Sequence, residues 1–208
     1  NSLDAFYLIN KLKYCCTILN YKNLATIDYQ LPLVEEILQH LQQHDYTHIP
    51  IIAIYYRALL TLTESDEEAH FKKLQSLLHL HLAELPEQEL QNLFVLSRNY
   101  CIKRINQGDN SYLPNLFKLY QTEITQGTIL VNGNIPPSTY KNVVALGLKL
   151  EEYTWTEQFI FNYKEHLASE FRAATFSLNL ARFHFSKQAF HEVIPLLHQI
   201  DYTEIFWA

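Results

Sequence analysis

The stretch that decides the fold of this chain lies near its C-terminal end, LGLKLEEYTWTEQFIFNYKEHL at residues 146–167. A second stretch, LARFHFSKQAFHEVIPLLHQI at residues 180–200, spaces its small and aromatic residues in nearly the same way. Corresponding residues lie 34 positions apart, except for Trp155 and Phe190, which lie 35 apart. A repeat of this length is typical of a helix hairpin that packs against copies of itself. The two stretches therefore predict a helical-repeat protein.

The repeated positions have distinct packing roles. Gly147 and Ala181 are small, so the first helix of each hairpin can approach its partner closely. Trp155 and Phe190 are expected to fill the start of the second helix. The other repeat positions are the pairs Leu146 and Leu180, Phe159 and Val193, and Tyr163 and Leu197. We expect Gly147→Leu to overpack its contact and Gly147→Ala to be mild or stabilising, since alanine favours helix.

The rest of the chain also has the helical period. Val34, Ile37, Leu38 and Leu41 fall at i, i+3, i+4 and i+7, which places them on one face of a helix. Turn-forming segments recur between such runs. This pattern predicts an all-α chain of about ten helices in five hairpins, near residues 1–44, 47–84, 87–127, 137–168 and 171–201.

Three local features sharpen this interpretation. Ser65 followed by Glu68 predicts a capping box at a helix N-terminus. The segment around residues 127–138 holds two of the four glycines and a Pro-Pro pair, which favours a linker, with a ligand-contacting loop as the alternative. Tyr140, just beyond it, is expected to fix the following helix to its neighbour. The chain is thus one helical-repeat domain over residues 1–208, or two sub-arrays at 1–127 and 135–208.

The segments from Gly147 to Tyr163 and from Ala181 to Leu197 resemble the tetratricopeptide repeat. That family has a small residue in the first helix, an aromatic residue near the turn, and small or aromatic residues in the second helix. This sequence departs from the pattern at Phe159, where a small residue is favoured, and it also looks like uncharacterised bacterial helical-repeat proteins. The resemblance implies a right-handed α-α superhelix, a solenoid of about five antiparallel hairpins that acts as a protein-binding scaffold.

The C-terminal residues lead to a further expectation. Ile205, Phe206 and Trp207 crowd the end of the chain without the polar face that usually closes a solenoid. We therefore expect the chain to be a piece of a longer array, able to self-associate through its exposed array ends.

Composition excludes several classes of protein. A formal net charge of -6, with sixteen Lys and Arg residues, disfavours nucleic acid as a partner. Arg57 interrupts the longest apolar run well short of the roughly 20 residues that span a bilayer, so no membrane segment is predicted. Cys15, Cys16 and Cys101 form no disulfide or CxxC pattern and are expected to be reduced core residues, which favours a cytoplasmic protein.

Candidate chemical sites are few. Glu36, His40 and His44 share one helical face and are the best metal candidates, although the HExxH arrangement is missing. His184, His191 and His198 are expected to line a packed or half-exposed surface, with a binding face as the alternative. We find no catalytic motif and expect no cofactor. The predicted function is a protein-protein interaction scaffold for a protein or peptide partner; the alternative is a metal-dependent hydrolase with its site between helices.

Overall fold

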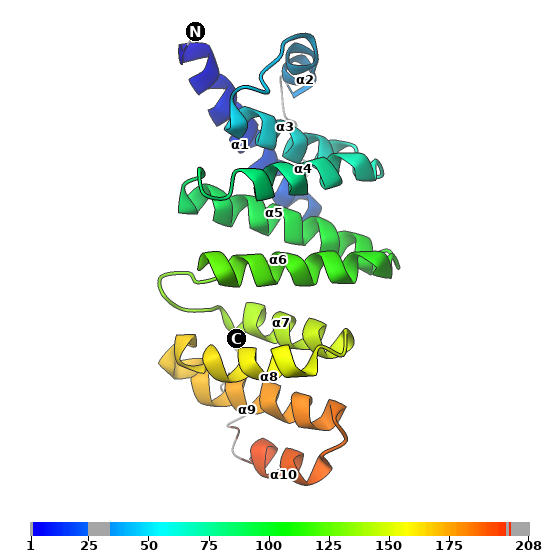
Figure 1. Ribbon diagram of the computed structural model, residues 1–208, viewed down its shortest axis with the longest axis vertical. Helices are drawn as coiled ribbons and strands as arrows, with labels where there is room; N and C mark the ends of the chain where they lie inside the picture. The colour runs from blue at the N-terminus through cyan, green and yellow to red at the C-terminus, as the bar shows by residue number, and fades with distance from the viewer. Residues whose placement is uncertain (1, 25–33, 199, 201–208) are drawn as a thin grey trace. The chain divides into compact units, whose positions relative to one another are not determined.

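The computed structural model describes residues 2–24, 34–198 and 200. Over these residues the chain is all-α, as predicted, with ten α-helices and two 3-10 helices (Figure 1). The α-helices are α1 (Ser2–Leu24), α2 (Val34–Gln43), α3 (Pro50–Thr63), α4 (Glu68–Leu80), α5 (Glu87–Asn106), α6 (Leu113–Gln126), α7 (Pro137–Lys149), α8 (Tyr153–Asn162), α9 (Ser169–Ser186) and α10 (Phe190–His198). The 3-10 helices are η1 (Asn110–Tyr112) and η2 (Lys164–His166). None of these helices is both long enough and apolar enough to cross a bilayer.

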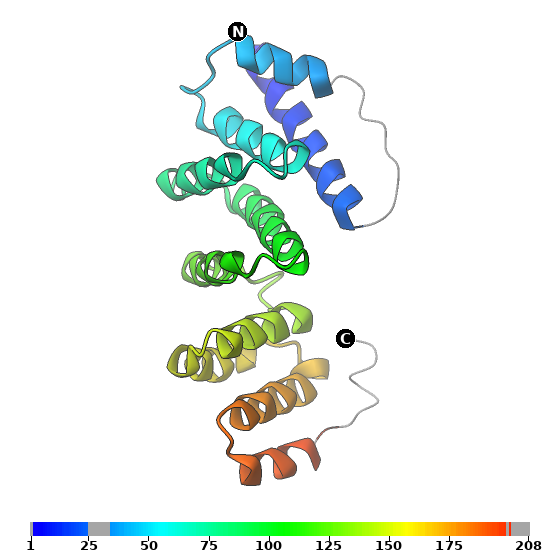
Figure 2. The ribbon, with the colours of Figure 1, turned by 90° about the vertical axis from the view of Figure 1, so that its right-hand side faces the viewer.

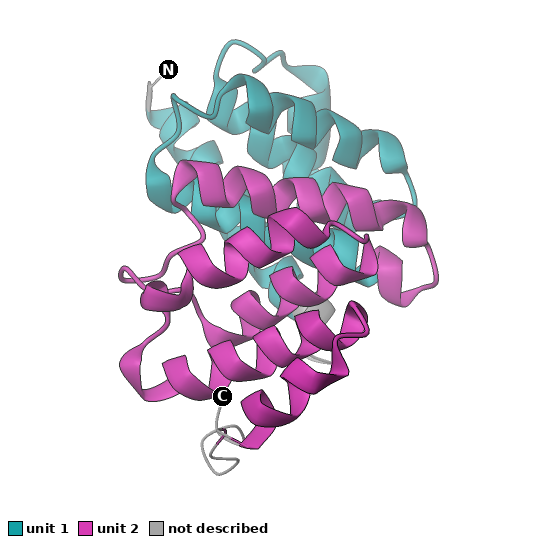
Figure 3. Ribbon diagram, turned by 60° about the horizontal axis from the view of Figure 1, so that its bottom comes forward, with its two compact units in different colours: residues 1–103 teal, residues 104–208 magenta. Residues whose placement is uncertain are grey.

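The chain divides into two compact units, residues 1–103 and residues 104–208 (Figure 3). The boundary falls inside α5. The segment 127–138, which composition singled out as a linker, lies within the second unit instead.

The first unit is built around α3, which packs against both α1 and α4. Figure 2 shows α1 meeting α3 at an angle. The core between these helices is apolar and closed to solvent; it includes Leu8, Leu12, Ile52, Leu59, Phe71 and Leu74. The predicted hairpin at 1–44 is therefore replaced by a pairing of α1 with α3. Apolar residues surround α1 on all sides, so its sequence does not indicate which face a partner will cover.

A partly buried polar contact holds α5 to this core. The Lys13 ammonium lies 2.5 Å from Oε1 of Glu89, and the Tyr55 hydroxyl donates to Oε2 of the same carboxylate at 2.6 Å. Lys13 of α1 and Tyr55 of α3 thus both contact the Glu89 carboxylate of α5. Burial, together with this carboxylate, raises the pKa of the Tyr55 hydroxyl above its ordinary value.

The capping box predicted at Ser65 and Glu68 is wrong. The N-cap residue of α4 is Glu67, and no side chain caps its N-terminus. Ser65 instead contacts α5, because its carbonyl accepts a hydrogen bond from the Tyr100 hydroxyl at 3.0 Å. A contact between helices that are distant in sequence has replaced the local motif.

The three cysteines are free and buried, as predicted. Burial raises the pKa of each thiol, in the case of Cys101 to about 12. The thiols therefore stay protonated near neutral pH and pack as small apolar groups.

In the second unit, the aromatic residues of the opening stretch form a stacked row along α8. Trp155, Phe159 and Tyr163 follow one another at i, i+4 and i+8, with ring centroids 5.6 Å and 5.0 Å apart. Phe117 of α6 meets Trp155 at 4.7 Å. Tyr140 of α7 contacts Phe159 and donates its hydroxyl to the Ile160 carbonyl at 2.6 Å, so it fixes α7 to α8 as predicted.

Three turns in this unit share one backbone geometry. Each has a residue with positive φ, Gly108, Glu151 or Gln188, two positions after the last residue of a helix. In each, the following N–H donates to a carbonyl five residues earlier, from Asp109 to Arg104, Glu152 to Gly147, and Ala189 to His184. The last two turns, at Glu151 and Gln188, lie 37 positions apart. The turns therefore repeat with a longer offset than the 34 residues read from the side chains.

When the two hairpins are aligned by their turns, with an offset of 37 residues, different residues become equivalent from those predicted. Phe190 becomes equivalent to Tyr153 rather than to Trp155, and it is 55% exposed. Phe190 contacts Phe185 at a centroid distance of 5.5 Å instead of filling the helix interface. Buried residues at the other repeat positions are Leu146, Gly147, Phe159, Leu180 and Ala181, whereas Trp155, Tyr163, Val193 and Leu197 are half-buried.

Gly147 lies at a close approach of α7 to α8. A Cβ atom built on Gly147 would overlap Oγ1 of Thr156 and lie 3.3 Å from its Cβ. Thr156 is fully buried, and its hydroxyl donates to the Glu152 carbonyl at 2.7 Å. The expected close approach at Gly147 is present, and the room is too small even for alanine.

The segment between α6 and α7 is a tight, ordered turn. Val131 and Asn134 exchange two backbone hydrogen bonds around Asn132 and Gly133, whose φ values are 52° and 79°. Two consecutive positive φ values are the signature of a type I′ turn. Ile135 is buried and its N–H donates to the carbonyl of His166 in η2 at 2.8 Å, so the turn is held against the unit.

Candidate functional site

The described residues form a concave surface in each unit. The α2–α4 pocket of the first unit has a volume of about 640 Å³ and is defined by Leu41, Asp45, Ile52, Tyr56, Arg57 and Lys73. The α7–α9 groove of the second unit has a volume of about 570 Å³ and is defined by Lys141, Ala145, Leu148, Leu178, Arg182 and Phe185. Both volumes fall within the range of roughly 300 to 1,000 Å³ that is usual for ligand sites.

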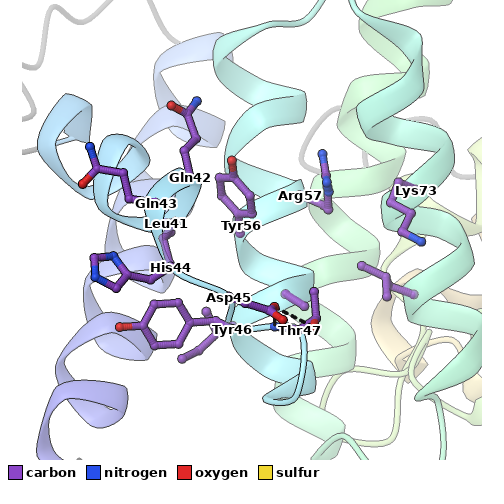
Figure 4. Close-up of a pocket in the computed structure, with 13 residues that line it drawn as sticks. Leu41, Gln42, Gln43, His44, Asp45, Tyr46, Thr47, Tyr56, Arg57 and Lys73 are labelled. Atoms are coloured by element: carbon purple, nitrogen blue, oxygen red, sulfur yellow. Dashed lines mark hydrogen bonds between the residues drawn. The ribbon is translucent and has the colours of Figure 1, made fainter.

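The α2–α4 pocket is closed on one side by the loop that joins α2 to α3. Asp45 orders this loop, because its Oδ1 accepts hydrogen bonds from the Thr47 N–H at 2.8 Å and the Thr47 hydroxyl at 2.6 Å (Figure 4). The Thr47 hydroxyl, and after it the Thr47 N–H, hold the pKa of Asp45 below its ordinary value. Pro50 then starts α3, where a missing N–H does no harm.

Arg57 is the most constrained charge of this pocket. Its guanidinium lies over the Tyr56 ring at 5.4 Å, and its Nη1 donates to Nδ1 of His70 at 3.3 Å. Since arginine can only donate, Nδ1 of His70 is the acceptor and Nε2 carries the hydrogen. That Nε2–H then donates to Glu64 at 2.8 Å. The chain Glu64, His70, Arg57 fixes the position of the guanidinium between α3 and α4.

The metal candidates Glu36, His40 and His44 do not form a ligand set. The rings of His40 and His44 stack at a centroid distance of 4.3 Å, with no gap for an ion between them. His40 Nε2 is hydrogen-bonded to the Tyr46 hydroxyl at 2.9 Å, and His44 Nδ1 to the His40 carbonyl at 3.0 Å. Within residues 2–24, 34–198 and 200, no three His, Cys, Asp or Glu side chains are arranged to hold a metal ion.

The three C-terminal histidines are also dispersed. His184 is half-buried beside Phe183, whereas His191 and His198 are exposed on α10. None of the three lines the α2–α4 pocket or the α7–α9 groove.

The α7–α9 groove is lined by equivalent positions of two neighbouring helices. Lys141, Ala145 and Leu148 of α7 are each followed 37 positions later by a groove residue of α9, namely Leu178, Arg182 and Phe185. This offset is the one that relates the turns at Glu151 and Gln188. The two helices pack against each other, and α10 adds Val193 and Leu197 to the groove.

The chemistry of the α7–α9 groove is apolar with a basic margin. Its surface is mostly carbon, and Phe185 is 61% exposed. Lys141 and Arg182 are exposed, with no ion pair to any described carboxylate. Asn142, next to Lys141, adds an amide that can donate and accept hydrogen bonds. The arrangement can hold an apolar side chain flanked by acidic groups.

Of the residues that line the two concave surfaces, sequence reasoning singled out Leu41, His44, Ala181, Val193 and Leu197, each for another role. It did not select Arg57, Lys141 or Arg182 as site residues. Arg57 was used only as the charge that interrupts an apolar run, yet a single charge in an apolar helix needs a partner or a role, and that could have marked it. Lys141 and Arg182 become equivalent in position to other groove residues only in the 37-residue register, which the side-chain pattern did not reveal.

Comparisons of this chain with protein-family models, curated proteins and solved structures found no match.

Proposed function

We propose that this protein is an interaction scaffold that binds a peptide segment of a partner protein in the α7–α9 groove. The groove is the observation that carries the proposal. It presents two neighbouring helices, α7 and α9, with the same spacing of lining residues, an apolar floor, and two cations that no described carboxylate neutralises. A partner segment with one or two apolar side chains flanked by Asp or Glu complements this surface.

The proposal includes the architecture implied by the tetratricopeptide resemblance. Repetition of one turn geometry at Gly108, Glu151 and Gln188 supports tandem hairpins in the second unit. A right-handed solenoid of such hairpins would extend the groove along successive first helices. The alternative of a metal-dependent hydrolase has no comparable support, since His40 and His44 use a ring nitrogen each for hydrogen bonds within the chain.

Selection from a random peptide library displayed on phage tests the proposal without a known partner. We expect enriched peptides to combine an apolar residue with flanking acidic residues. Their affinity for the 208-residue chain, measured by fluorescence polarisation, should fall about tenfold or more in Lys141→Glu/Arg182→Glu, because attraction becomes repulsion.

Lys118→Glu/Lys149→Glu is the matched control, since it makes the same change in net charge at two exposed lysines outside the groove lining. Melting curves of both double variants show whether the fold is intact. A library that yields no enriched peptide, or peptides whose affinity falls equally in both double variants, would refute the proposed site.

A further inference from the structure

We propose that the α2–α4 pocket of the first unit is a separate binding site for a small amphiphilic carboxylate. Its acidic group would pair with Arg57, and its apolar body would cover Ala53 and Leu77. The ligand class is thus a monocarboxylic acid with a hydrocarbon body. This inference does not depend on the peptide groove of the second unit.

Arg57 provides the charge for an acidic ligand. Among the described residues its contacts are the Tyr56 ring and His70 Nδ1, and it forms no ion pair with a carboxylate. The nearest acid in its hydrogen-bonded chain is Glu64, which is separated from Arg57 by the imidazole of His70. His70 takes one donor of the guanidinium, so further N–H groups remain to receive a carboxylate.

The distribution of charge in the pocket is also basic. Lys73 contributes a second cation, likewise without a described ion pair. Asp45 is the one carboxylate among the lining residues, and its Oδ1 is occupied by the two hydrogen bonds from Thr47. A basic pocket in a chain of net charge -6 attracts anions against the overall field of the protein.

The side chains indicate where the acidic group would lie. In Figure 4 the Tyr56 hydroxyl and the Arg57 guanidinium both point toward the upper part of the view, where Gln42 is drawn. The Lys73 ammonium points away from them. We therefore place the carboxylate at the Arg57 end, with the Tyr56 hydroxyl as a second donor, and assign Lys73 a long-range electrostatic role.

The remaining wall selects the body of the ligand. The pocket surface is mostly carbon, to which the half-buried Ala53 and Leu77 contribute, whereas Leu41 and Ile52 lie behind it in the core. Burying a hydrocarbon body against this surface adds affinity that a bare phosphate or sulfate ion lacks. The loop from His44 to Thr47 closes one side, which suits a compact molecule better than an extended acidic peptide.

The direct test is calorimetric titration of the 208-residue chain with octanoate, octan-1-ol, octylammonium and inorganic phosphate. We expect octanoate to bind with a dissociation constant of about 0.1 to 1 mM, reasonable for a ligand of some ten heavy atoms. Octan-1-ol and octylammonium lack the negative charge, so each should bind at least about tenfold more weakly than octanoate. Inorganic phosphate lacks the apolar body, so it should also bind at least about tenfold more weakly. Equal affinities for octanoate and octan-1-ol, or no octanoate binding up to about 10 mM, would overturn the proposal.

Variants locate the site. Arg57→Gln should weaken octanoate binding about tenfold or more while leaving octan-1-ol unaffected. Lys118→Gln, which removes an exposed positive charge outside the lining of both the pocket and the groove, is the matched control and should leave octanoate binding unchanged. If Arg57→Gln does not fold, Tyr56→Phe removes only a donor hydroxyl and Lys73→Gln only an exposed charge, and each should weaken octanoate binding by a few-fold.

Two results would contradict this assignment. One is octanoate affinity that all three folded pocket variants retain. The other is tighter binding of a glutamate-rich peptide that displaces octanoate, since the ligand would then be an acidic protein segment.

Discussion

Replacing Gly147 by alanine should destabilise the second unit, although alanine is the better helix former. Gly147 lies in α7 with helical backbone, so alanine introduces no strain in φ. Its methyl group, however, would overlap the Thr156 hydroxyl. Thr156 cannot move aside freely, because its side chain is fully buried and its hydroxyl is bound to the Glu152 carbonyl. This overlap favours the opposite of the early expectation of a mild or stabilising effect.

The size of the effect follows from two opposing terms. Overpacking a well-packed interface costs about 1 to 3 kcal/mol. Helix propensity returns at most about 1 kcal/mol. With the full helix-propensity gain, the net loss in the free energy of unfolding should be up to about 2 kcal/mol, and it should be larger for Gly147→Leu, whose side chain must displace α8.

A double-mutant cycle separates the contact from the other effects. Urea unfolding is measured for Gly147→Ala, Thr156→Ala and the double variant by circular dichroism. Because Thr156→Ala removes the overlapping atom, the double variant should be more stable than the sum of the single effects predicts, by about 1 kcal/mol or more. Thr154→Ala is the matched control, because Thr154 is exposed on the same helix and should add to Gly147→Ala without coupling.

The reasoning fails if Gly147→Ala stabilises the protein. It fails equally if the coupling to Thr156→Ala is no larger than the coupling to Thr154→Ala. Either result would mean that α7 and α8 separate at this point at little cost.

Two further predictions concern pH and the turn between α6 and α7. Burial raises the pKa of Tyr55 and Tyr140 in the folded chain, so above pH of about 10 the unfolded chain releases protons that the folded chain retains. The melting temperature should therefore fall as the pH rises from about 9 to 11, and it should fall less in Tyr55→Phe. An equal fall in that variant would show that ionisation of Tyr55 is not the cause. Gly133→Ala should lower the free energy of unfolding by about 1 kcal/mol through backbone strain alone, because φ is 79° and no atom lies within 4 Å of the added carbon. An unchanged urea midpoint would show that the turn relaxes.

Helix content and helix positions could be predicted because their causes are local. The apolar spacing of Ile37 and Leu41 marks the buried face of α2. Pro137 and Gly127 mark a helix start and a helix end, since proline suits the first turn and glycine adopts the positive φ that follows the last. Tyr140 was also interpreted correctly, because a large aromatic residue at the start of a helix needs a neighbour within its reach.

The candidate sites depend on relations that the sequence does not carry locally. Arg57 gains its fixed position only when α4 brings His70 beside it. Lys141 and Arg182 face one groove only because α7 and α9 pack side by side. The metal candidates also show this dependence on the tertiary structure. The sequence places His40 and His44 on one helical face, but one ring nitrogen of each is hydrogen-bonded, to the Tyr46 hydroxyl and to the His40 carbonyl respectively.

The sequence by itself thus determined that the described chain is helical, approximately which ranges hold its pairs of helices, and that Gly147 sits at a close helix contact. Tertiary structure decided that α1 pairs with α3, that Ser65 contacts Tyr100 instead of capping α4, and that the turns at Glu151 and Gln188 repeat after 37 residues. The physical reason is the range of the forces involved. Backbone hydrogen bonds and caps act within a few residues of the chain. Burial of apolar surface, in contrast, stabilises any pair of apolar faces that fit together, so the pairing of helices depends on the shapes of segments far apart in the chain.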